Sequence, residues 1–209
     1  MTRELLAGLD RFREEYFPRN REHYRRLVEE GQHPRTLFIG CADSRVVPDL
    51  ITDAPPGALF VVRNVGNLVP PAEKEGGPHG VSAAIEFAVD ILKVEDIVVC
   101  GHSHCGAMEA LYRPPPEASE NLRGWLELAA GARLDEEPTP EVLRRTEQRS
   151  VALQLHRLMD FPNVRAGVEA GRISLHGWHY VIEEGEIYVL DVGSGTFVPH
   201  GELPADDPD

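Results

Sequence analysis

The stretch "GVSAAIEFAVDILKVEDIVVCG" (residues 80–101) joins a helical pattern directly to a strand pattern. Its first part repeats apolar residues three and four positions apart, which is the spacing of one helical face. That face consists of Val81, Ala84, Ile85, Ala88, Ile91 and Leu92. Its last part, "EDIVVCG", is a continuous apolar run of strand length, as expected of a strand that is covered on both faces of a sheet.

Two similar apolar runs, "TLFIG" (36–40) and "ALFVV" (58–62), come before this stretch. Strand, helix and strand in this order indicate a parallel βαβ unit. Further helices are expected within residues 113–140 and 140–161. Residues 172–193 alternate on both sides of "EEGE", which predicts a hairpin or a strand pair. We therefore predict an α/β fold with a central, mostly parallel sheet flanked by helices.

The chain starts with two helical patterns on either side of Pro18, and the second pattern ends on Gly31 as a helix C-terminus often does. No internal repeat divides the sequence further. We expect one domain over residues 1–209, with residues 1–31 as an N-terminal helical arm and residues 200–209 as a flexible tail.

The net charge of −14 argues against a nucleic-acid partner, because phosphate contacts need a basic surface. The apolar runs are too short to span a bilayer, which argues against a membrane partner. The charged N-terminus lacks the apolar segment of a secretory signal, so a cytoplasmic protein is expected. Three cysteines do not pair evenly, and in a reducing cytosol they favour metal ligands or nucleophiles over disulfides.

The strand pattern ends in "HSHCGAM", where His102 and Cys105 are three positions apart. In a turn entering a helix both side chains can face one point, and an imidazole with a thiolate suits zinc. Cys41 leaves the end of another strand, and parallel strands present their carboxyl ends at one edge of the sheet. We therefore expect Cys41, His102 and Cys105 to bind one metal ion. His104 could replace His102 in this set, while Cys100 is assigned to the core.

Cys41 belongs to "CADSR" (41–45), which also brings Asp43 and Arg45 to the end of a buried strand. Three protein ligands leave a fourth position for water, from which zinc supplies hydroxide near neutral pH. Asp43 can accept a hydrogen bond from this zinc-bound hydroxide, and Arg45 can hold the carboxylate off the metal by a bidentate pair. Two thiolates cancel the zinc charge, so we expect the water to ionise above the ~7 of an all-imidazole site.

These motifs resemble those of the β-class carbonic anhydrases. "CADSRVVP" is similar to the family's C-x-D-x-R element, and "CGHSHCGAM" is similar to its H-x-x-C element. "LFVVRNVGNLVPP", "AAIEFAV" and "LHGWHYVIEEGEI" are similar to its R-N-x-[AG]-N segment, the helix that follows and the C-terminal strand pair, in family order. The resemblance implies reversible hydration of carbon dioxide to bicarbonate and a proton. It also implies one Zn²⁺ per chain on the three expected ligands, with Asp43 and Arg45 as catalytic residues.

The resemblance also implies a substrate pocket. Gln32 matches a family glutamine that hydrogen-bonds the substrate or product, and Gly106 matches the small residue beside the second thiolate. Phe60, Val65 and Phe87 match an apolar lining, which suits uncharged carbon dioxide better than bicarbonate. Family members are dimers or larger, with sites at the subunit interface and N-terminal helices wrapped over the partner. We therefore expect a homodimer or a tetramer; an arm packed on its own domain is the alternative.

Some bacterial members bind bicarbonate in a regulatory pocket made by a Trp, an Arg and a Tyr. Arg63 and Tyr180 match the last two, but Phe38 stands at the Trp position and lacks the indole donor. We therefore predict that this pocket is absent or weak and that the catalytic aspartate stays paired with its arginine. His79 and His104 are candidate proton shuttles by residue type, with exposed structural histidines as the alternative.

Three other functions need to be weighed. Relatives of this family hydrolyse carbon disulfide or carbonyl sulfide on the same kind of site, and the access channel decides the substrate. A non-catalytic zinc- or bicarbonate-binding assembly protein is disfavoured, since a structural zinc site normally closes with a fourth protein ligand. A phosphatase-type thiol nucleophile is also disfavoured, because Arg45 follows Cys41 too closely and no glycine-rich phosphate loop follows the cysteine.

Overall fold

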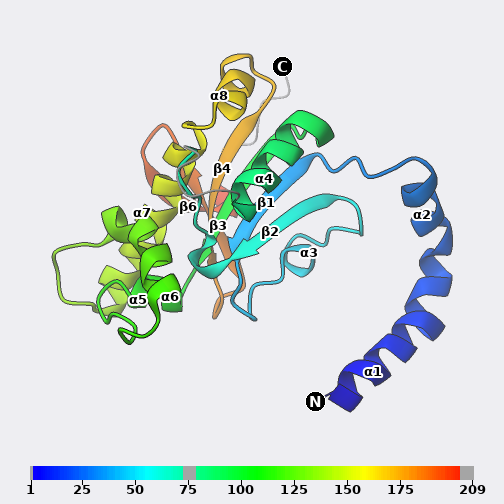
Figure 1. Cartoon of the computed structure of the whole chain (residues 1–209), viewed down its shortest axis with the longest axis horizontal. Helices are drawn as coiled ribbons and strands as arrows, with labels where there is room; N and C mark the ends of the chain where they lie inside the picture. The colour runs from blue at the N-terminus through cyan, green and yellow to red at the C-terminus, as the bar shows by residue number, and fades with distance from the viewer. Residues whose placement is uncertain (1, 73–78, 203–209) are drawn as a thin grey trace.

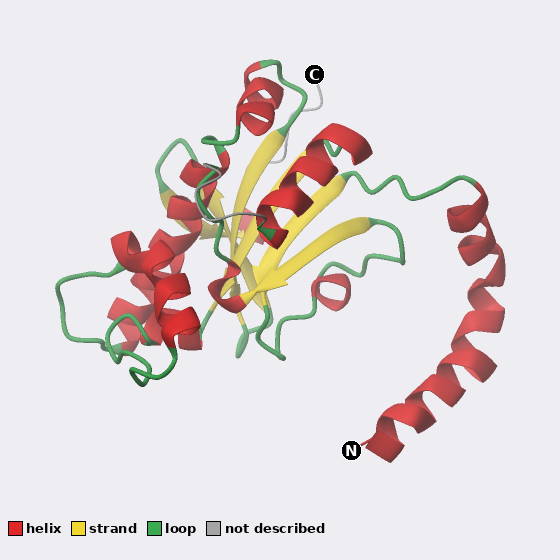
Figure 2. Cartoon of the chain, in the orientation of Figure 1, coloured by secondary structure: helices red, strands yellow, loops and turns green. Residues whose placement is uncertain are grey.

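A six-stranded sheet organises the structure, a computed structural model that describes residues 2–72 and 79–202. The strands lie in the order β2-β1-β3-β4-β5-β6. Figure 2 shows the sheet in yellow with helices around it. They are β1 (Thr36–Cys41), β2 (Leu59–Asn64), β3 (Asp96–His102), β4 (Ser174–Val181), β5 (Glu186–Asp191) and β6 (Thr196–Pro199). The first four strands pair in parallel, whereas β5 and β6 are added antiparallel. The predicted fold class and C-terminal strand pair are confirmed, and β6 is an additional strand that the sequence pattern did not predict.

Helices flank the sheet, and α4 lies across one of its faces (Figure 1). The α-helices are α1 (Thr2–Arg11), α2 (Phe17–Glu29), α3 (Pro48–Ile51), α4 (Gly80–Glu86), α5 (Gly106–Glu109), α6 (Glu120–Leu126), α7 (Pro140–Leu158) and α8 (Pro162–Glu169). α6 and α7 lie in the two segments where helices were expected, and α7 packs against β3 and β4. Within the described residues, no helix has the length and apolar character needed to cross a membrane.

The helical face predicted around α4 is correct at its start and wrong at its end. Val81, Ile85 and Ala88 are buried as expected, but the Ile91 side chain is 65% exposed and Val89 is buried. The reason is that α4 continues as a π-helix over Phe87–Leu92, which takes more residues per turn than an α-helix. Each residue after the change is therefore rotated away from the face that a regular α-helical period predicts.

The N-terminal arm extends away from the sheet (Figure 1). It is more continuous than predicted, because a π-helical segment over Phe12–Tyr16 joins α1 to α2 and Pro18 lies in the first turn of α2. Proline has no N–H to donate to the preceding turn and its ring crowds that turn, and the change from π-helical to α-helical geometry falls directly before it. None of the residues in α1, α2 or the segment between them is buried. The predicted end of the arm is correct, with Gly31 in the left-handed region at φ 84°.

Both faces of the central strands are buried, as their continuous apolar sequence predicts. On one face the side chains of β1 and β3 pack with α4, α7 and α8, around Leu37, Ile85 and Val151. A second cluster, formed by Phe38, Val98 and Cys100, packs with Trp178 and Tyr180 of β4. Cys100 is therefore a core residue, as expected.

Only part of the predicted flexible tail, residues 200–209, falls within the described residues. After β6, His200–Glu202 form a single 3-10 turn. The remaining residues of the expected flexible tail, 203–209, lie outside the described residues.

Helix α7 lies close against β3 at Gly101, the residue before His102. A Cβ atom on Gly101 would lie 2.7 Å from Val151 Cγ2 and 3.7 Å from the Glu147 carbonyl oxygen. Val151 is fully buried and β-branched, so its methyl group has little room to move. Glycine at this position thus allows the helix to lie directly against the end of the strand.

We predict that Gly101→Ala lowers the free energy of unfolding by about 1–3 kcal/mol, because the new methyl group overpacks this contact. Gly124→Ala is the matched control, since a Cβ atom on Gly124, in α6, would meet nothing within 4 Å. The control is expected to gain up to about 1 kcal/mol from helix propensity. Urea unfolding followed by circular dichroism measures both, and equal stability of Gly101→Ala and the native protein would refute the prediction.

Candidate metal centre

Three buried side chains meet at the carboxyl edge of the sheet. Cys41 ends β1, His102 ends the neighbouring strand β3, and Cys105 follows three residues later as the residue before α5. Their ligand atoms all lie within 4.8 Å of one another. The predicted convergence of these residues, which are far apart in sequence, is therefore present in the structure.

The state of His102 fits a metal ligand. Its Nδ1 lies 2.9 Å from the Ser103 carbonyl oxygen, an acceptor that fixes the N–H on this nitrogen. Nε2 then carries the lone pair, and it is a buried atom with no hydrogen-bond partner among the described residues. His104, the alternative, has a side chain that is 64% exposed and lies 3.3 Å from Glu183 instead. Two sulfur atoms and this free imidazole nitrogen form a donor set that suits zinc.

Asp43 and Arg45 form the expected bidentate pair beside the three ligands. Arg45 donates from Nε to Asp43 Oδ1 at 2.9 Å and from Nη2 to Oδ2 at 2.7 Å. The Arg45 backbone N–H also donates to Oδ1, at 3.0 Å. These hydrogen bonds hold the pKa of the Asp43 carboxyl well below its usual range. Asp43 is therefore ionised throughout the physiological pH range.

Two arginines tie the ligand segments together. Arg45 Nη2 also donates to the His104 carbonyl oxygen at 3.0 Å, which links "CADSR" to the turn between His102 and Cys105. Arg63 of β2 donates to the carbonyl oxygens of Cys41 and Asp43, at 2.9 and 2.6 Å. The main chain around the site is thus fixed by charged hydrogen bonds.

The two thiols share their protons unequally. The neighbouring Cys105 thiol lowers the pKa of Cys41, against the opposing effect of burial. The Cys41 thiolate and burial together raise the pKa of Cys105. Burial alone would lower the pKa of His102, but the nearby Cys41 sulfur and its negative charge outweigh burial and raise that pKa. Without a metal, the site therefore retains protons that a cation must displace.

Gly66 contributes a contact that the sequence pattern did not reveal. Its backbone N–H points at Cys41 Sγ, 3.4 Å away. Gly66 has φ 79°, and a Cβ atom there would lie 2.9 Å from the Cβ of Ala107. Glycine is needed at this turn after β2 because of its positive φ and because Ala107 lies so close. In the sequence, the glycine of "NVGN" was the feature that could have indicated this turn.

Comparison with known proteins agrees with this geometry. Residues 36–187 match a family model described as carbonic anhydrase. A solved β-carbonic anhydrase, CcaA, superposes with a TM-score of 0.88 at 38% sequence identity, over 95% of this chain and 98% of that one. The chain belongs to the β-class carbonic anhydrases.

Other members of this carbonic anhydrase family match over nearly the whole chain. A carbonic anhydrase of Pseudomonas aeruginosa is 42% identical over 97% of this chain and 93% of its own length. Carbonic anhydrase 1 of Escherichia coli O157:H7 is 43% identical over 97% and 94%. A solved structure of tetrameric β-carbonic anhydrases from Sordaria macrospora matches with a TM-score of 0.79 at 29% identity, over 94% of this chain and 98% of that one.

In this carbonic anhydrase, only part of the expected substrate pocket lies beside the three ligands. Val65 directly follows β2, whose last residue pairs with Cys41, and Gly106 directly follows Cys105. A Cβ atom on the exposed Gly106 would meet nothing within 4 Å, so nothing in the described part of this chain requires a small residue there.

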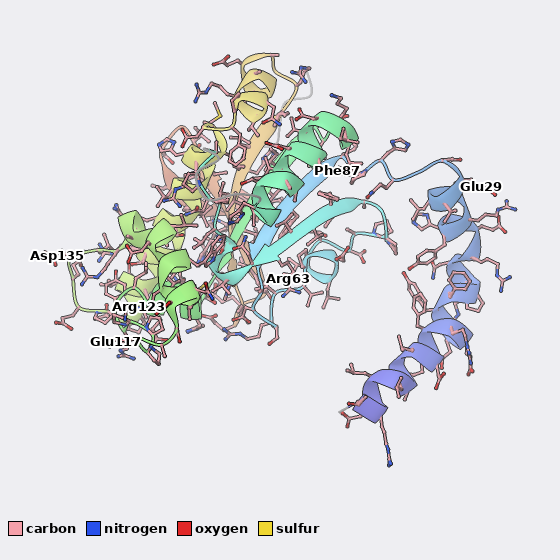
Figure 3. All side chains as sticks on the ribbon, in the orientation of Figure 1. Glu29, Arg63, Phe87, Glu117, Arg123 and Asp135 are labelled. Atoms are coloured by element: carbon pink, nitrogen blue, oxygen red, sulfur yellow. The ribbon has the colours of Figure 1, made fainter. Side chains whose placement is uncertain are left out.

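Phe60, Phe87 and Gln32 are not brought to the ligands of their own chain. Phe60 pairs with Leu37, four residues before Cys41, which is roughly 13 Å along the strand. Phe87 stacks on Phe60 with ring centroids 5.7 Å apart. In Figure 3, Phe87 is labelled beside the helix that follows α4, apart from Arg63 near the carboxyl end of β2. Gln32 precedes β1 altogether and is exposed.

The remaining candidates have other contacts in the structure. His79 accepts a hydrogen bond from the Val81 N–H at the start of α4 and stacks on Trp125, with centroids 5.5 Å apart. Phe38, at the position of the regulatory Trp, is fully buried and packs edge-on against Trp178 at 6.0 Å. A shuttle role for either His79 or His104, and the absence of bicarbonate regulation, remain predictions.

Four polar residues around the ligand turn were missed from the sequence: Ser103, Glu147, His179 and Glu183. Ser103 donates to Glu183 at 2.7 Å, which with the His104 side chain lowers the pKa of Glu183 to about 2. Glu147 lies on the buried face of α7, which also carries buried polar residues, so the sequence pattern did not single it out. It accepts a hydrogen bond from the Cys105 N–H.

We predict that zinc binding to the metal-free protein releases at least one proton near pH 7. The raised pKa of Cys105 keeps its thiol protonated there, and the raised pKa of His102 adds a further proton as the pH falls. Apparent zinc affinity should therefore decrease with decreasing pH. Calorimetric titrations with zinc in two buffers of different ionisation enthalpy measure the released protons.

Cys100→Ala is the matched control for this titration. Burial raises the pKa of Cys100 to about 12, and Cys100 lies outside the ligand group, so its removal should leave the proton release unchanged. Cys105→Ser should abolish the thiol contribution. Zinc binding with no proton release at pH 7 would contradict the prediction that the Cys105 thiol is protonated in the metal-free protein.

Proposed function

We propose that this chain catalyses the reversible hydration of carbon dioxide to bicarbonate and a proton, with one zinc ion held by Cys41, His102 and Cys105. Membership of the carbonic anhydrase family makes this reaction the first candidate. The observation that carries the proposal is the group of three buried ligand atoms within 4.8 Å of one another, beside a bidentate Asp43–Arg45 pair.

Zinc fits the donor set, and the three protein ligands leave one tetrahedral position for a small molecule. When bound, zinc would supply a Lewis acid that lowers the pKa of a water molecule and makes it a nucleophile near neutral pH. The two thiolates reduce the positive charge of the centre, so the activity should require a somewhat alkaline pH to become maximal.

Asp43 is placed to orient the nucleophile. Its Oδ2 lies 4.0 Å from His102 Nε2, and so it faces the ligand group from just outside it. Arg45 donates two hydrogen bonds to Oδ1 and one to Oδ2, which leaves a lone pair on Oδ2 to accept a hydrogen bond from an O–H of the attacking water. The same clamp restrains Asp43 from moving into the fourth ligand position.

We further propose that a second copy of the chain completes the substrate pocket. Gln32, Phe60 and Phe87 are far from the ligands of their own chain, yet Phe87 is 40% exposed and stacked on Phe60, which leaves an apolar surface available. The Sordaria macrospora relatives are described as tetrameric. A homodimer or a tetramer would bring this surface to a neighbouring ligand group and give the unburied arm a surface to pack on.

A reducing compartment such as the cytoplasm is the proposed location. Cys41 and Cys105 are free thiols that lie close together. An oxidising environment would favour their modification and the loss of two ligands.

We predict zinc-dependent hydration of carbon dioxide, measured by stopped flow on zinc-quantified protein from pH 6 to 9. The rate should rise with pH as one ionisation, without an extra collapse below neutral pH, because the regulatory Trp is replaced by Phe38. Asp43→Asn should lower kcat by about 10²-fold or more at full zinc content. Cys105→Ser should lose both zinc and activity.

Two outcomes would count against this proposal. An inactive protein with a full zinc site would direct attention to carbon disulfide as the substrate. A steep loss of activity below neutral pH would indicate that a regulatory bicarbonate pocket is present despite Phe38.

We predict that Asp43→Asn and Gln32→Ala complement each other in mixed oligomers, because each intact site would take Asp43 from one chain and Gln32 from the other. Co-refolding the two inactive variants should restore about one site in four in a randomly paired dimer. Asp43→Asn mixed with Cys105→Ser is the control, since both changes affect the same half of the site. Absence of restoration in a verified mixed oligomer would place Gln32 outside the partner's pocket.

A further inference from the structure

We propose that Glu147, held by His179, is a positioning residue for the metal centre: it fixes the main chain of Cys105 and thereby aims the Cys105 thiolate at the metal. This inference rests on the proposed zinc site. It assigns a role to a buried ion-pairing group that the hydration mechanism itself does not use.

The contact joins the middle of α7 to the ligand turn. Glu147 Oε1 accepts a hydrogen bond from the Cys105 backbone N–H at 3.1 Å. The other carboxylate oxygen, Oε2, lies 3.0 Å from His179 Nε2 of β4. Glu147 is 4% exposed and His179 is fully buried, so all three groups are shielded from water.

A glutamate at this place is costly for the fold. The other buried residues of α7 are mixed: Val142, Val151 and Leu158 are apolar, whereas Thr146, Ser150 and Gln154 are polar. Replacing both members of a buried polar pair with well-packed apolar residues is often neutral or stabilising, so stability alone does not account for the pair of Glu147 and His179. The carboxylate therefore needs an explanation other than stability, and its hydrogen bond to a metal ligand provides one.

The ligand turn is held on its other sides as well. Ser103 Oγ accepts from the Ile182 N–H at 3.0 Å, and Arg45 donates to the His104 carbonyl oxygen. His104 has φ 58°, a left-handed conformation that is uncommon outside glycine. Glu147 secures the next residue, Cys105, at the point where the chain leaves this turn and enters α5.

His179 limits the freedom of Glu147. Its Nε2 contacts the carboxylate, whereas its Nδ1 has no hydrogen-bond partner among the described residues. Phe197 packs edge-on against the imidazole with centroids 6.3 Å apart. With its second oxygen held in this way, the carboxylate presents the first oxygen to Cys105 in a fixed direction. Outer contacts of this kind typically change metal affinity by about 10–100-fold.

The deciding variant is Glu147→Leu, which keeps a similar volume but removes both hydrogen bonds. We expect its thermal midpoint to fall, because the Cys105 N–H and His179 Nε2 are left buried without a hydrogen-bond partner. Its zinc affinity should fall about 10–100-fold. The cobalt-substituted protein should also show altered thiolate-to-cobalt absorption, because the geometry of Cys105 has changed.

Two matched variants separate positioning from general damage to α7. Glu147→Gln keeps an oxygen for the Cys105 N–H and should bind zinc within about threefold of the native protein, well inside the 10–100-fold range of a lost outer contact. Thr146→Val removes a neighbouring buried hydrogen bond, between Thr146 Oγ1 and the Tyr112 hydroxyl at 2.6 Å, and should leave zinc affinity and the cobalt spectrum unchanged. Equal weakening by Thr146→Val would overturn the proposal.

Zinc affinity is measured with the metal alone, by competition with a chromogenic chelator, so the result does not depend on carbon dioxide hydration. Native affinity and cobalt absorption in Glu147→Leu would overturn the positioning role. If Glu147→Leu does not fold, His179→Leu decides: about tenfold weaker zinc binding supports the proposal, and unchanged binding overturns it. Cys105→Ser is the reference, because unchanged zinc binding in that variant would show instead that the proposed metal site has failed.

Discussion

The parallel pairing of β1 with β3 is the constraint on which the site depends. In this register Gly40 lies beside Cys100, so the two strands reach the sheet edge together and place Cys41 and His102 side by side. Backbone hydrogen bonds of the sheet set this arrangement, and the apolar residues on both faces stabilise it. The ligand group is therefore formed by the fold itself, and a metal ion need not organise it.

Convergence at a strand end is not sufficient for a defined site, because strand ends lead into loops. Here the loops are fixed by charged side chains whose acceptors and donors are mostly main-chain groups. Arg63 and Arg45 reach three carbonyl oxygens around the ligands, and Glu147 takes the N–H of Cys105. Such charge-assisted hydrogen bonds are stronger than neutral ones. They restrict the thiolates and the imidazole to a narrow range of positions.

Most of the fold and the ligand set could be predicted from the sequence, since both follow from local patterns. Continuous apolar runs marked the strands, and polar residues directly after them marked the site. The π-helical end of α4, which exposes Ile91, could not be predicted, because a hydrophobic period assumes regular helical geometry. The contact of Glu147 with Cys105 depends on how α7 packs over β3. The separation of Phe60 from its own ligand group depends on strand register, which motifs do not encode.

The exposed arm has a consequence for the order in which the protein is made. Its helices bury no residue within the chain, so the sheet and its flanking helices can become compact while the arm is still free. Within the arm, local contacts such as the stacking of Phe12 on Tyr16 at 5.5 Å and the Arg25–Glu22 ion pair at 2.8 Å support the helix. Its contacts with the domain include a His23–Pro56 hydrogen bond at 2.7 Å near the end of α2. A long helix with few tertiary contacts is only marginally stable in water. In the proposed oligomer, maturation would therefore divide into two events: the folding of the domain, and the later ordering of the arm on a second chain.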